Sequence, residues 1–263
     1  MSARPTLFFI HGMWSYAAVW DRMRTALEAQ GFTTHAATLP GHDGMAGDLT
    51  RLGLADYGDA LETQAKAHSN LVIIGHSMGG LLAQQLAARV QPRALVLLST
   101  APSAKIFSAY PSALRTMWPV IGQWGYWHRA TMISMHAADY GISNGVSQAE
   151  SVTEYRKLQP DSGRVAFEIG LPFLDRNRAA AVDYARLTMP TLLLCGENDR
   201  ICCPPVSRAT AKRIPGPVTL AMLPDFGHWI IGERGSPLVA ARIAEFLESV
   251  SGPPENGVCH QIV

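Results

Sequence analysis

The sequence predicts an α/β fold, with a mostly parallel six-stranded sheet, helices on both faces of the sheet and a helical lid insertion. Short apolar runs alternate with stretches of helical periodicity along most of the chain. The apolar runs are nearly continuous, which is typical of strands buried on both faces of a parallel sheet. Between residues 101 and 186 the strand pattern disappears, so an insertion is expected between two of the strands.

The candidate strands are the six apolar runs Thr6–Ile10, Thr33–Thr38, Asn70–Ile74, Ala94–Leu98, Thr191–Cys195 and Val218–Leu223. Helical patterns follow five of them, at Tyr16–Gln30, Ala55–His68, Met78–Val90, Pro205–Ile214 and Leu238–Val250. Strands separated by helices in this way indicate parallel pairing with helical crossovers. Glycine, proline and small polar residues mark the connections between them.

Residues 1–100 and 187–250 are therefore expected to form the core of the protein, and residues 101–186 a helical cap, or lid. This cap segment is rich in Trp, Tyr, Met and Phe and poor in charge. An insertion of this length between consecutive strands should lie over the carboxyl edge of the sheet, where open α/β sheets bind ligands. Residues 251–263 are rich in proline and glycine and are expected to form a flexible tail.

The composition argues against several classes of partner. The 263 residues include 22 basic and 21 acidic ones, and no basic block favours nucleic acid. The apolar run before His11 is too short for a signal peptide or a membrane span, so a cytoplasmic protein is expected. The expected oligomeric state is a monomer or a homodimer. No metal role is expected for the four cysteines, which lack C-x-x-C spacing: Cys195, Cys202, Cys203 and Cys259.

A serine stands inside a tight glycine-rich turn in the stretch "VIIGHSMGGLL". Gly75-x-Ser77-x-Gly79 follows a candidate strand and opens a candidate helix, as a nucleophile elbow requires. The turn strains the serine backbone, and residues without a β-carbon fit two positions before and after it. The helix N-terminus would direct free N–H groups toward an oxyanion formed beside the serine.

Three other positions supply partners for Ser77. "LLLCGENDRI" places Asp199 in the loop after one strand, and "LPDFGHWI" places His228 in the loop after the last strand. "FFIHGMW" places Met13 just after the first strand, where its backbone N–H could point to the same position as that of Met78. Two such N–H groups would form an oxyanion hole.

These motifs resemble those of the α/β-hydrolase family of serine esterases. "HGMW", "GHSMGG", "GENDR" and "GHW" stand in the order and spacing of that family, and the resemblance covers the whole chain except the tail. The opening "FFIHGMWSYAAVWDRM" is similar to a branch that includes methyl-ester esterases, hydroxynitrile lyases and bacterial hydrolases. Five residues precede Thr6, so the two extra strands of the larger family sheet are not expected.

The resemblance implies a role for each residue of the motifs. Ser77 would attack a carbonyl carbon, His228 would accept its proton, and Asp199 would orient the imidazole. Met13 and Met78 would contribute only their backbone N–H groups. The related lyases carry a lysine directly after the catalytic histidine, and Trp229 at that position argues against lyase activity. His76 is interpreted as a packing or hydrogen-bonding residue.

Five tryptophans are candidates for the substrate pocket. Trp14 follows Met13 and Trp229 follows His228, whereas Trp118, Trp124 and Trp127 lie in the cap segment. A cap this aromatic and this poor in charge predicts an apolar pocket.

The predicted function is hydrolysis of a carboxylic ester of an apolar small molecule through an acyl-enzyme, with no cofactor. The same triad also serves thioesterases, lactonases, carbon–carbon bond hydrolases and cofactor-free perhydrolases, and the sequence leaves these open. A receptor that binds a small molecule without turnover is an alternative of another class.

Overall fold

The computed structural model describes residues 4–250, and the expected tail lies outside these residues. The central sheet consists of β1 (Thr6–Ile10), β2 (Thr33–Ala36), β3 (Leu71–His76), β4 (Ala94–Leu98), β7 (Thr191–Gly196) and β8 (Val218–Leu223). The spatial order is β2-β1-β3-β4-β7-β8, and every neighbouring pair is parallel. This arrangement confirms the predicted fold class.

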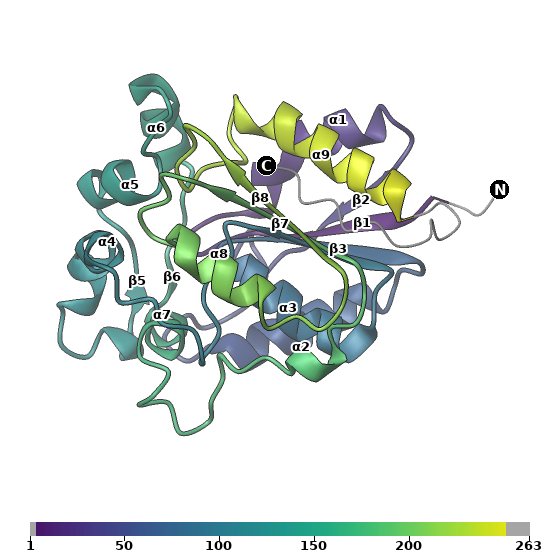
Figure 1. Ribbon diagram of the computed structural model, residues 1–263. Coiled ribbons are helices and arrows are strands. Elements are labelled where there is room, and N and C mark those ends of the chain that lie inside the picture. Colours follow the sequence, from purple (N-terminus) through teal and green to yellow (C-terminus); the bar gives the residue numbers. More distant parts are fainter. Residues whose placement is uncertain (1–3, 251–263) are drawn as a thin grey trace.

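Helices cover both faces of the sheet (Figure 1). One face carries α1 (Asp21–Glu28) and α9 (Gly235–Ser249), which pack on each other. The opposite face carries α2 (Leu54–Ala65), α3 (Met78–Val90) and α8 (Pro204–Ala211). The sheet is therefore the middle of three layers.

The buried strand β1 shows why the apolar runs are continuous. Successive side chains of a strand point to opposite faces of the sheet. Leu7 and Phe9 pack in the core cluster that includes α1 and α9, whereas Phe8 and Ile10 pack in the cluster that includes α2 and α3. All four side chains are fully buried, because both faces of the sheet are covered.

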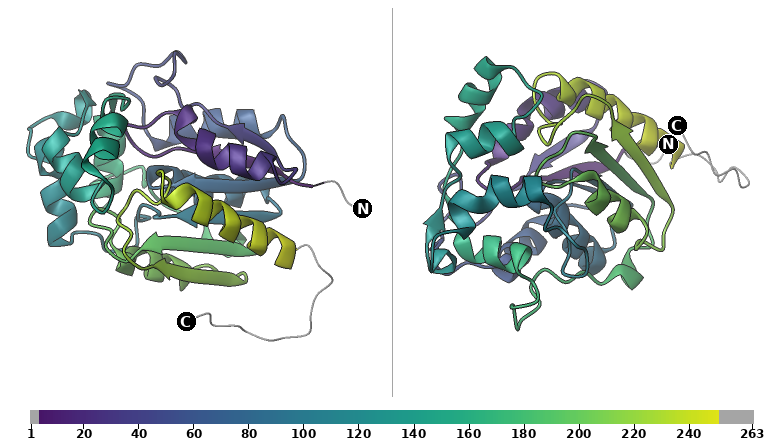
Figure 2. Two further views of the ribbon diagram at one scale, coloured as in Figure 1. Left: turned by 90° about the horizontal axis from the view of Figure 1, so that it is seen from above. Right: turned by 60° about the vertical axis from the view of Figure 1, so that its left-hand side comes forward.

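The segment between β4 and β7 contains helices joined by long irregular loops and lies at one end of the sheet (Figure 2). Its helices are α4 (Pro111–Ile121), α5 (Met135–Gly141), α6 (Gln148–Tyr155) and α7 (Gly163–Gly170). It also contains β5 (Ala130–Thr131) and β6 (Asp161–Ser162), which pair antiparallel as a short ribbon, together with the 3-10 turns η2 (Tyr126–His128) and η3 (Tyr184–Arg186). Strands of two residues are too short to leave a periodic pattern in the sequence, so the ribbon was not predicted.

Two helix boundaries differ from the sequence prediction for local reasons. The predicted helix Tyr16–Gln30 is a 3-10 turn, η1 (Ala17–Trp20), followed by α1, because the backbone of Tyr16 is extended and Gly31 adopts a positive φ of 84°. Helix α9 begins at Gly235 instead of Leu238. Pro237 lies in its first turn, where a missing N–H removes no intrahelical hydrogen bond.

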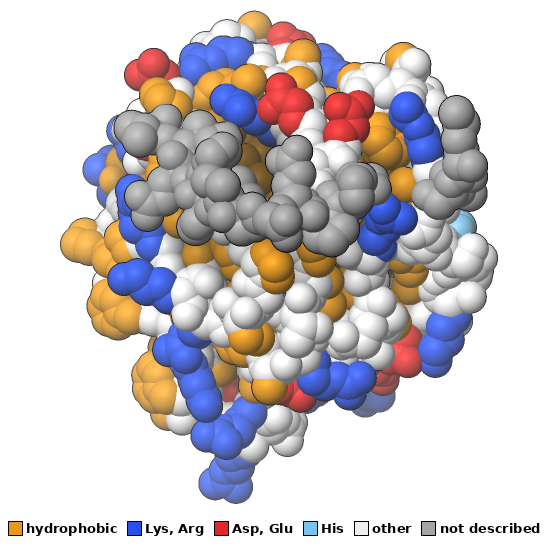
Figure 3. All heavy atoms as spheres, turned by 45° about the vertical axis from the view of Figure 1, so that its right-hand side comes forward, with side chains coloured by type: hydrophobic (Ala, Val, Ile, Leu, Met, Phe, Trp, Pro, Cys, Tyr) orange, Lys and Arg blue, Asp and Glu red, His pale blue; other side chains and the backbone are white. Residues whose placement is uncertain are grey.

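The surface carries charges of both signs. Figure 3 shows basic and acidic side chains on one face, with uncharged surface between most of them. Within residues 4–250, no helix is both long enough and apolar enough to span a bilayer.

Candidate active site

Ser77 occupies the turn between β3 and α3 in a strained conformation. Its φ of 57° and ψ of −124° are unusual for a residue with a side chain. A β-carbon on Gly75 would lie 2.1 Å from the carbonyl oxygen of Gly79, and one on Gly79 would lie 2.2 Å from that of Ile10. The turn therefore requires glycine on both sides of the serine, and it exposes the Ser77 side chain at the carboxyl edge of the sheet.

We expect Gly79→Ala to destabilise the protein by more than about 3 kcal/mol, because its new methyl group meets backbone that cannot move without disturbing β1. Urea denaturation followed by circular dichroism measures the loss. Gly170→Ala is the matched control, since a β-carbon there has no atom within 4 Å. Equal stability of the two variants would contradict this account of the turn.

His228 and Asp199 form a buried pair beside Ser77. The Nδ1 of His228 lies 2.8 Å from Oδ2 of Asp199, and both side chains are nearly inaccessible to solvent. The other oxygen of Asp199, Oδ1, accepts backbone hydrogen bonds from Ile201 at 3.0 Å and Cys202 at 2.8 Å. With the proton of Nδ1 directed at Asp199, Nε2 is the ring nitrogen available as a base.

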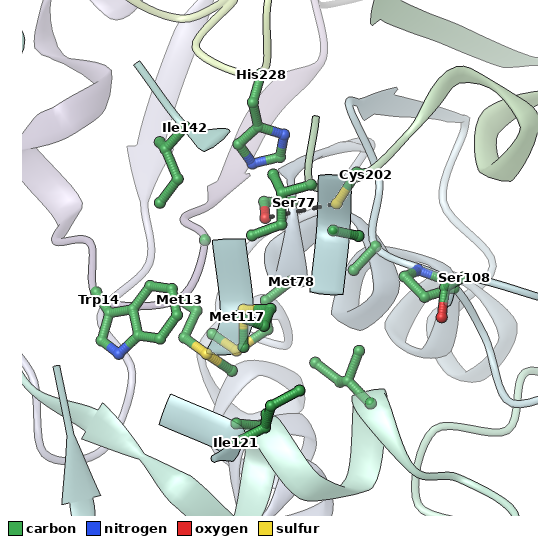
Figure 4. Close-up of a pocket in the computed structure, with 18 of the residues that line it drawn as sticks. Met13, Trp14, Ser77, Met78, Ser108, Met117, Ile121, Ile142, Cys202 and His228 are labelled. Carbon is green, nitrogen blue, oxygen red and sulfur yellow. Dashed lines mark hydrogen bonds between the residues drawn. The ribbon is translucent and has the colours of Figure 1, made fainter. Parts of the chain in front are cut away.

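The structure brings Ser77 and His228 to the wall of one cavity. Figure 4 shows the imidazole of His228 directed toward Ser77, and Cys202 also lies near the serine, with its Sγ 4.0 Å from the serine Oγ. Burial raises the pKa of the Cys202 thiol well above its usual value, so this thiol stays protonated beside the serine.

His76, directly before the serine, supports the loop of His228. Its Nε2 donates a hydrogen bond to the backbone carbonyl of His228 at 3.0 Å, and its ring packs edge-on against Trp229. Burial and the nearby His228 lower the pKa of His76 well below its usual value. His76 therefore remains neutral and keeps the one proton that this hydrogen bond needs.

Met13 and Met78, whose N–H groups are the predicted oxyanion donors, both line the same cavity. Met78 is the first residue of α3, and the first N–H groups of a helix have no acceptor within the helix. The loop that carries Met13 passes directly against the serine, because a β-carbon on Gly12 would lie 3.0 Å from the Cβ of Ser77. Figure 4 shows the side chains of Met13 and Met78 near Met117, below Ser77 in this view.

The cavity has a volume of about 350 Å³ and is mostly apolar. None of its lining residues, all within the described part of the chain, is Lys, Arg, Asp or Glu. Apolar side chains that the sequence prediction missed form much of the wall: Met117, Ile121, Ile142, Leu158, Ile169 and Leu171. The sequence contained a pattern that pointed to two of them: Met117 and Ile121 stand four residues apart on α4 and therefore share one face of the helix.

The five candidate tryptophans divide into two groups. Trp14 and Trp229 line the cavity, whereas the three cap tryptophans do not. Trp118 is 67% exposed and Trp124 is 87% exposed, and Trp127 packs against Phe167 and Tyr126 instead. Helix α4 turns Met117 toward the cavity, so the adjacent Trp118 is directed to solvent.

The described residues contain no group of three or more His, Cys, Asp or Glu side chains placed to hold a metal ion. The three described cysteines, Cys195, Cys202 and Cys203, are buried and free.

Comparison with known proteins identifies the family of this chain. A family model described as serine aminopeptidase, S33, matches residues 1–235. A pimeloyl-(acyl-carrier protein) methyl ester esterase of Xanthomonas campestris is 29% identical over 233 residues, which cover 85% of this chain and 90% of that protein. A pyrethroid hydrolase of Sphingobium wenxiniae is 24% identical over 256 residues, which cover 92% of this chain and 88% of that protein.

A solved structure shows the same fold. The crystal structure of a methylesterase from Arabidopsis has a TM-score of 0.72 at 13% identity, over 93% of this chain and 99% of that one. The family match covers far more than half of the 263 residues. The chain therefore belongs to the serine aminopeptidase S33 family, which consists of serine hydrolases with the α/β-hydrolase fold.

Proposed function

We propose that the protein hydrolyses a carboxylic ester of an apolar small molecule through an acyl-enzyme. One observation supports the proposal: Ser77, His228, Met13 and Met78 all line one apolar cavity, and none of its lining residues is Lys, Arg, Asp or Glu. Such a cavity favours an uncharged substrate, because a charged group would be desolvated there without a partner.

In the acylation step, Oγ of Ser77 bonds to the carbonyl carbon while Nε2 of His228 accepts the hydroxyl proton. The carbonyl oxygen gains the negative charge, and the N–H groups of Met13 and Met78 stabilise it. The carbon–oxygen bond to the alcohol then breaks, and His228 gives its proton to the departing alcohol. Asp199 holds the imidazole and stabilises its charged form throughout.

In the deacylation step, water takes the place of the alcohol. His228 accepts a proton from the water as the hydroxide oxygen bonds to the acyl carbon. Breakdown of the second tetrahedral intermediate returns the proton to Ser77 and releases the carboxylic acid. The same residues and the same N–H groups therefore serve both halves of the reaction.

The relatives support an ester as the substrate, since two of them are a methyl ester esterase and a pyrethroid hydrolase. The same triad also serves hydrolysis of thioesters, lactones and carbon–carbon bonds, and perhydrolysis. The cavity also suits a receptor that binds without turnover, and a turnover measurement separates the two.

The test is hydrolysis of p-nitrophenyl esters with acyl chains from acetyl to palmitoyl. We expect measurable turnover with an optimum at a medium chain length, because the cavity of about 350 Å³ lies near the lower end of typical ligand sites. Absence of turnover by the folded protein toward these esters, matched thioesters and lactones would contradict the proposal and favour a receptor.

Met117→Trp tests whether the acyl chain occupies the cavity. We expect this variant to prefer a shorter chain and to lose roughly tenfold or more in kcat/KM for the best wild-type ester. Trp118→Ala is the control from the same helix, because the Trp118 side chain is exposed and lies outside the cavity wall. An unchanged chain-length profile in Met117→Trp would place the acyl group elsewhere.

A further inference from the structure

Trp14, which follows the proposed oxyanion donor Met13, has a backbone conformation that needs external support. Its φ is 60°, and bulky side chains rarely adopt positive values. The residue is 1% exposed, so water cannot satisfy its polar groups. Such a conformation persists only where the surrounding structure fixes it.

Every polar group of Trp14 is bonded to the cap segment. Its backbone N–H donates to Oδ2 of Asp161 at 3.0 Å, and its indole N–H donates to the carbonyl of Thr131 at 3.1 Å. Its carbonyl accepts a hydrogen bond from the backbone N–H of Gln159 at 2.8 Å. These partners belong to the β5–β6 ribbon and the residues just before β6, more than 110 positions away in the sequence.

Asp161 is the one charged group among these partners, and it is fully buried. Its Oδ2 also lies 3.3 Å from Nε2 of His42. Its Oδ1 accepts hydrogen bonds from the hydroxyl of Tyr57 and from the backbone N–H of Ser162, both at 2.7 Å. Oδ1 therefore accepts two hydrogen bonds, whereas Oδ2 accepts one from Trp14 and lies beside the imidazole of His42.

These donors keep the carboxylate ionised. Burial by itself would raise the pKa of Asp161, but His42, Tyr57 and the N–H of Trp14 together lower it below its usual value. Burial would likewise lower the pKa of His42, but Asp161 raises it above its usual value. A charged acceptor makes the hydrogen bond to Trp14 stronger than a neutral one would.

We propose that Asp161 is a positioning residue for the oxyanion hole. By accepting the N–H of Trp14, its carboxylate fixes the plane of the peptide bond between Met13 and Trp14. The direction of the N–H of Met13 relative to that plane depends only on φ and ψ of Met13. The cap segment thereby sets the direction of an N–H group in the core, in addition to enclosing the cavity. This inference rests on the proposed function of the same site.

The test compares Asp161→Asn with wild type, using kcat, KM and the affinity of two ketones. A trifluoromethyl ketone forms a tetrahedral oxyanion adduct with the nucleophilic serine, whereas the matching methyl ketone occupies the cavity without needing the oxyanion hole. We expect kcat and the affinity for the trifluoromethyl ketone to fall by the same factor, roughly tenfold to 100-fold. KM and the affinity for the methyl ketone should stay within about threefold of wild type.

Glu168→Gln is the matched control. Glu168 is also a buried carboxylate of the cap segment, and it accepts a hydrogen bond from a backbone N–H of the core, that of Leu54, at 2.7 Å. Leu54, however, begins α2 and does not line the cavity. We expect its ketone affinities to equal those of wild type, even where its melting temperature falls as much as that of Asp161→Asn.

Three outcomes would overturn the inference. One is full kcat in Asp161→Asn, and another is a loss of kcat with an unchanged ratio of the two ketone affinities. If Asp161→Asn does not fold, Tyr57→Phe replaces it, because this variant removes one hydrogen bond to Asp161 and keeps the carboxylate. The third outcome is an unchanged ratio of the two ketone affinities in Tyr57→Phe. A wild-type protein that neither turns over esters nor binds the trifluoromethyl ketone contradicts the proposed function itself and this inference with it.

Discussion

Replacing Ser77 by alanine is expected to lower kcat by roughly 10⁵- to 10⁶-fold, since loss of a nucleophile removes the covalent route altogether. The fold should be unaffected. Alanine keeps the β-carbon at φ 57°, and the hydroxyl lies 4.0 Å from Sγ of Cys202, which is too long for a strong hydrogen bond. Release of p-nitrophenol measures the rate, and the melting temperature reports on the fold. Binding of the methyl ketone should persist, because the cavity wall is unchanged.

Ser99→Ala is the control for this prediction. Ser99 follows β4 as Ser77 follows β3, and it also has a positive φ, 43°. It is fully buried and does not line the cavity. We expect its kcat to stay within about tenfold of wild type, a change typical of a buried residue outside the chemistry. If Ser77→Ala retained more than about 1% of the wild-type kcat, Ser77 would not be the nucleophile.

The sheet and the elbow could be predicted from the sequence because local rules determine them. Continuous apolar runs indicate strands buried on both faces, and the glycines around Ser77 mark a turn that only small residues permit. The loops of Asp199 and His228 follow strands whose carboxyl ends must share one edge of a parallel sheet. The places of these residues could therefore be predicted without knowing which residues far apart in the sequence contact each other.

The cavity wall could not be predicted in the same way. The prediction chose aromatic residues, but the side of α4 that faces the cavity depends on how the whole cap segment packs on the core. Met117 faces the cavity and Trp118 faces solvent, although they are neighbours in the sequence. The contacts of Asp161 with Tyr57 and Trp14 span 104 and 147 positions, so no local sequence pattern predicts them.

Replacing Asp199 by asparagine is expected to lower kcat by roughly 10⁴-fold, as loss of the triad acid does in other serine hydrolases. If the amide nitrogen of asparagine takes the place of Oδ2, it donates a hydrogen bond to Nδ1 of His228. The imidazole proton would then be on Nε2, which could not accept the proton of Ser77. The opposite orientation would bring the amide nitrogen against the N–H groups of Ile201 and Cys202. Both orientations therefore impair the site, and kcat for the best p-nitrophenyl ester measures the loss.

Asp225→Asn distinguishes this role from a general effect of acidic residues near the histidine. Asp225 stands three residues before His228 in the same loop, but it is exposed, whereas Asp199 is 4% exposed. We expect its kcat to stay within about threefold of wild type, because an exposed carboxylate interacts weakly through water. A larger loss in Asp225→Asn than in Asp199→Asn would transfer the role of the acid to Asp225. The hydrogen bonds to both oxygens of Asp199 favour the opposite result, since they hold one carboxylate in the single orientation that the imidazole requires.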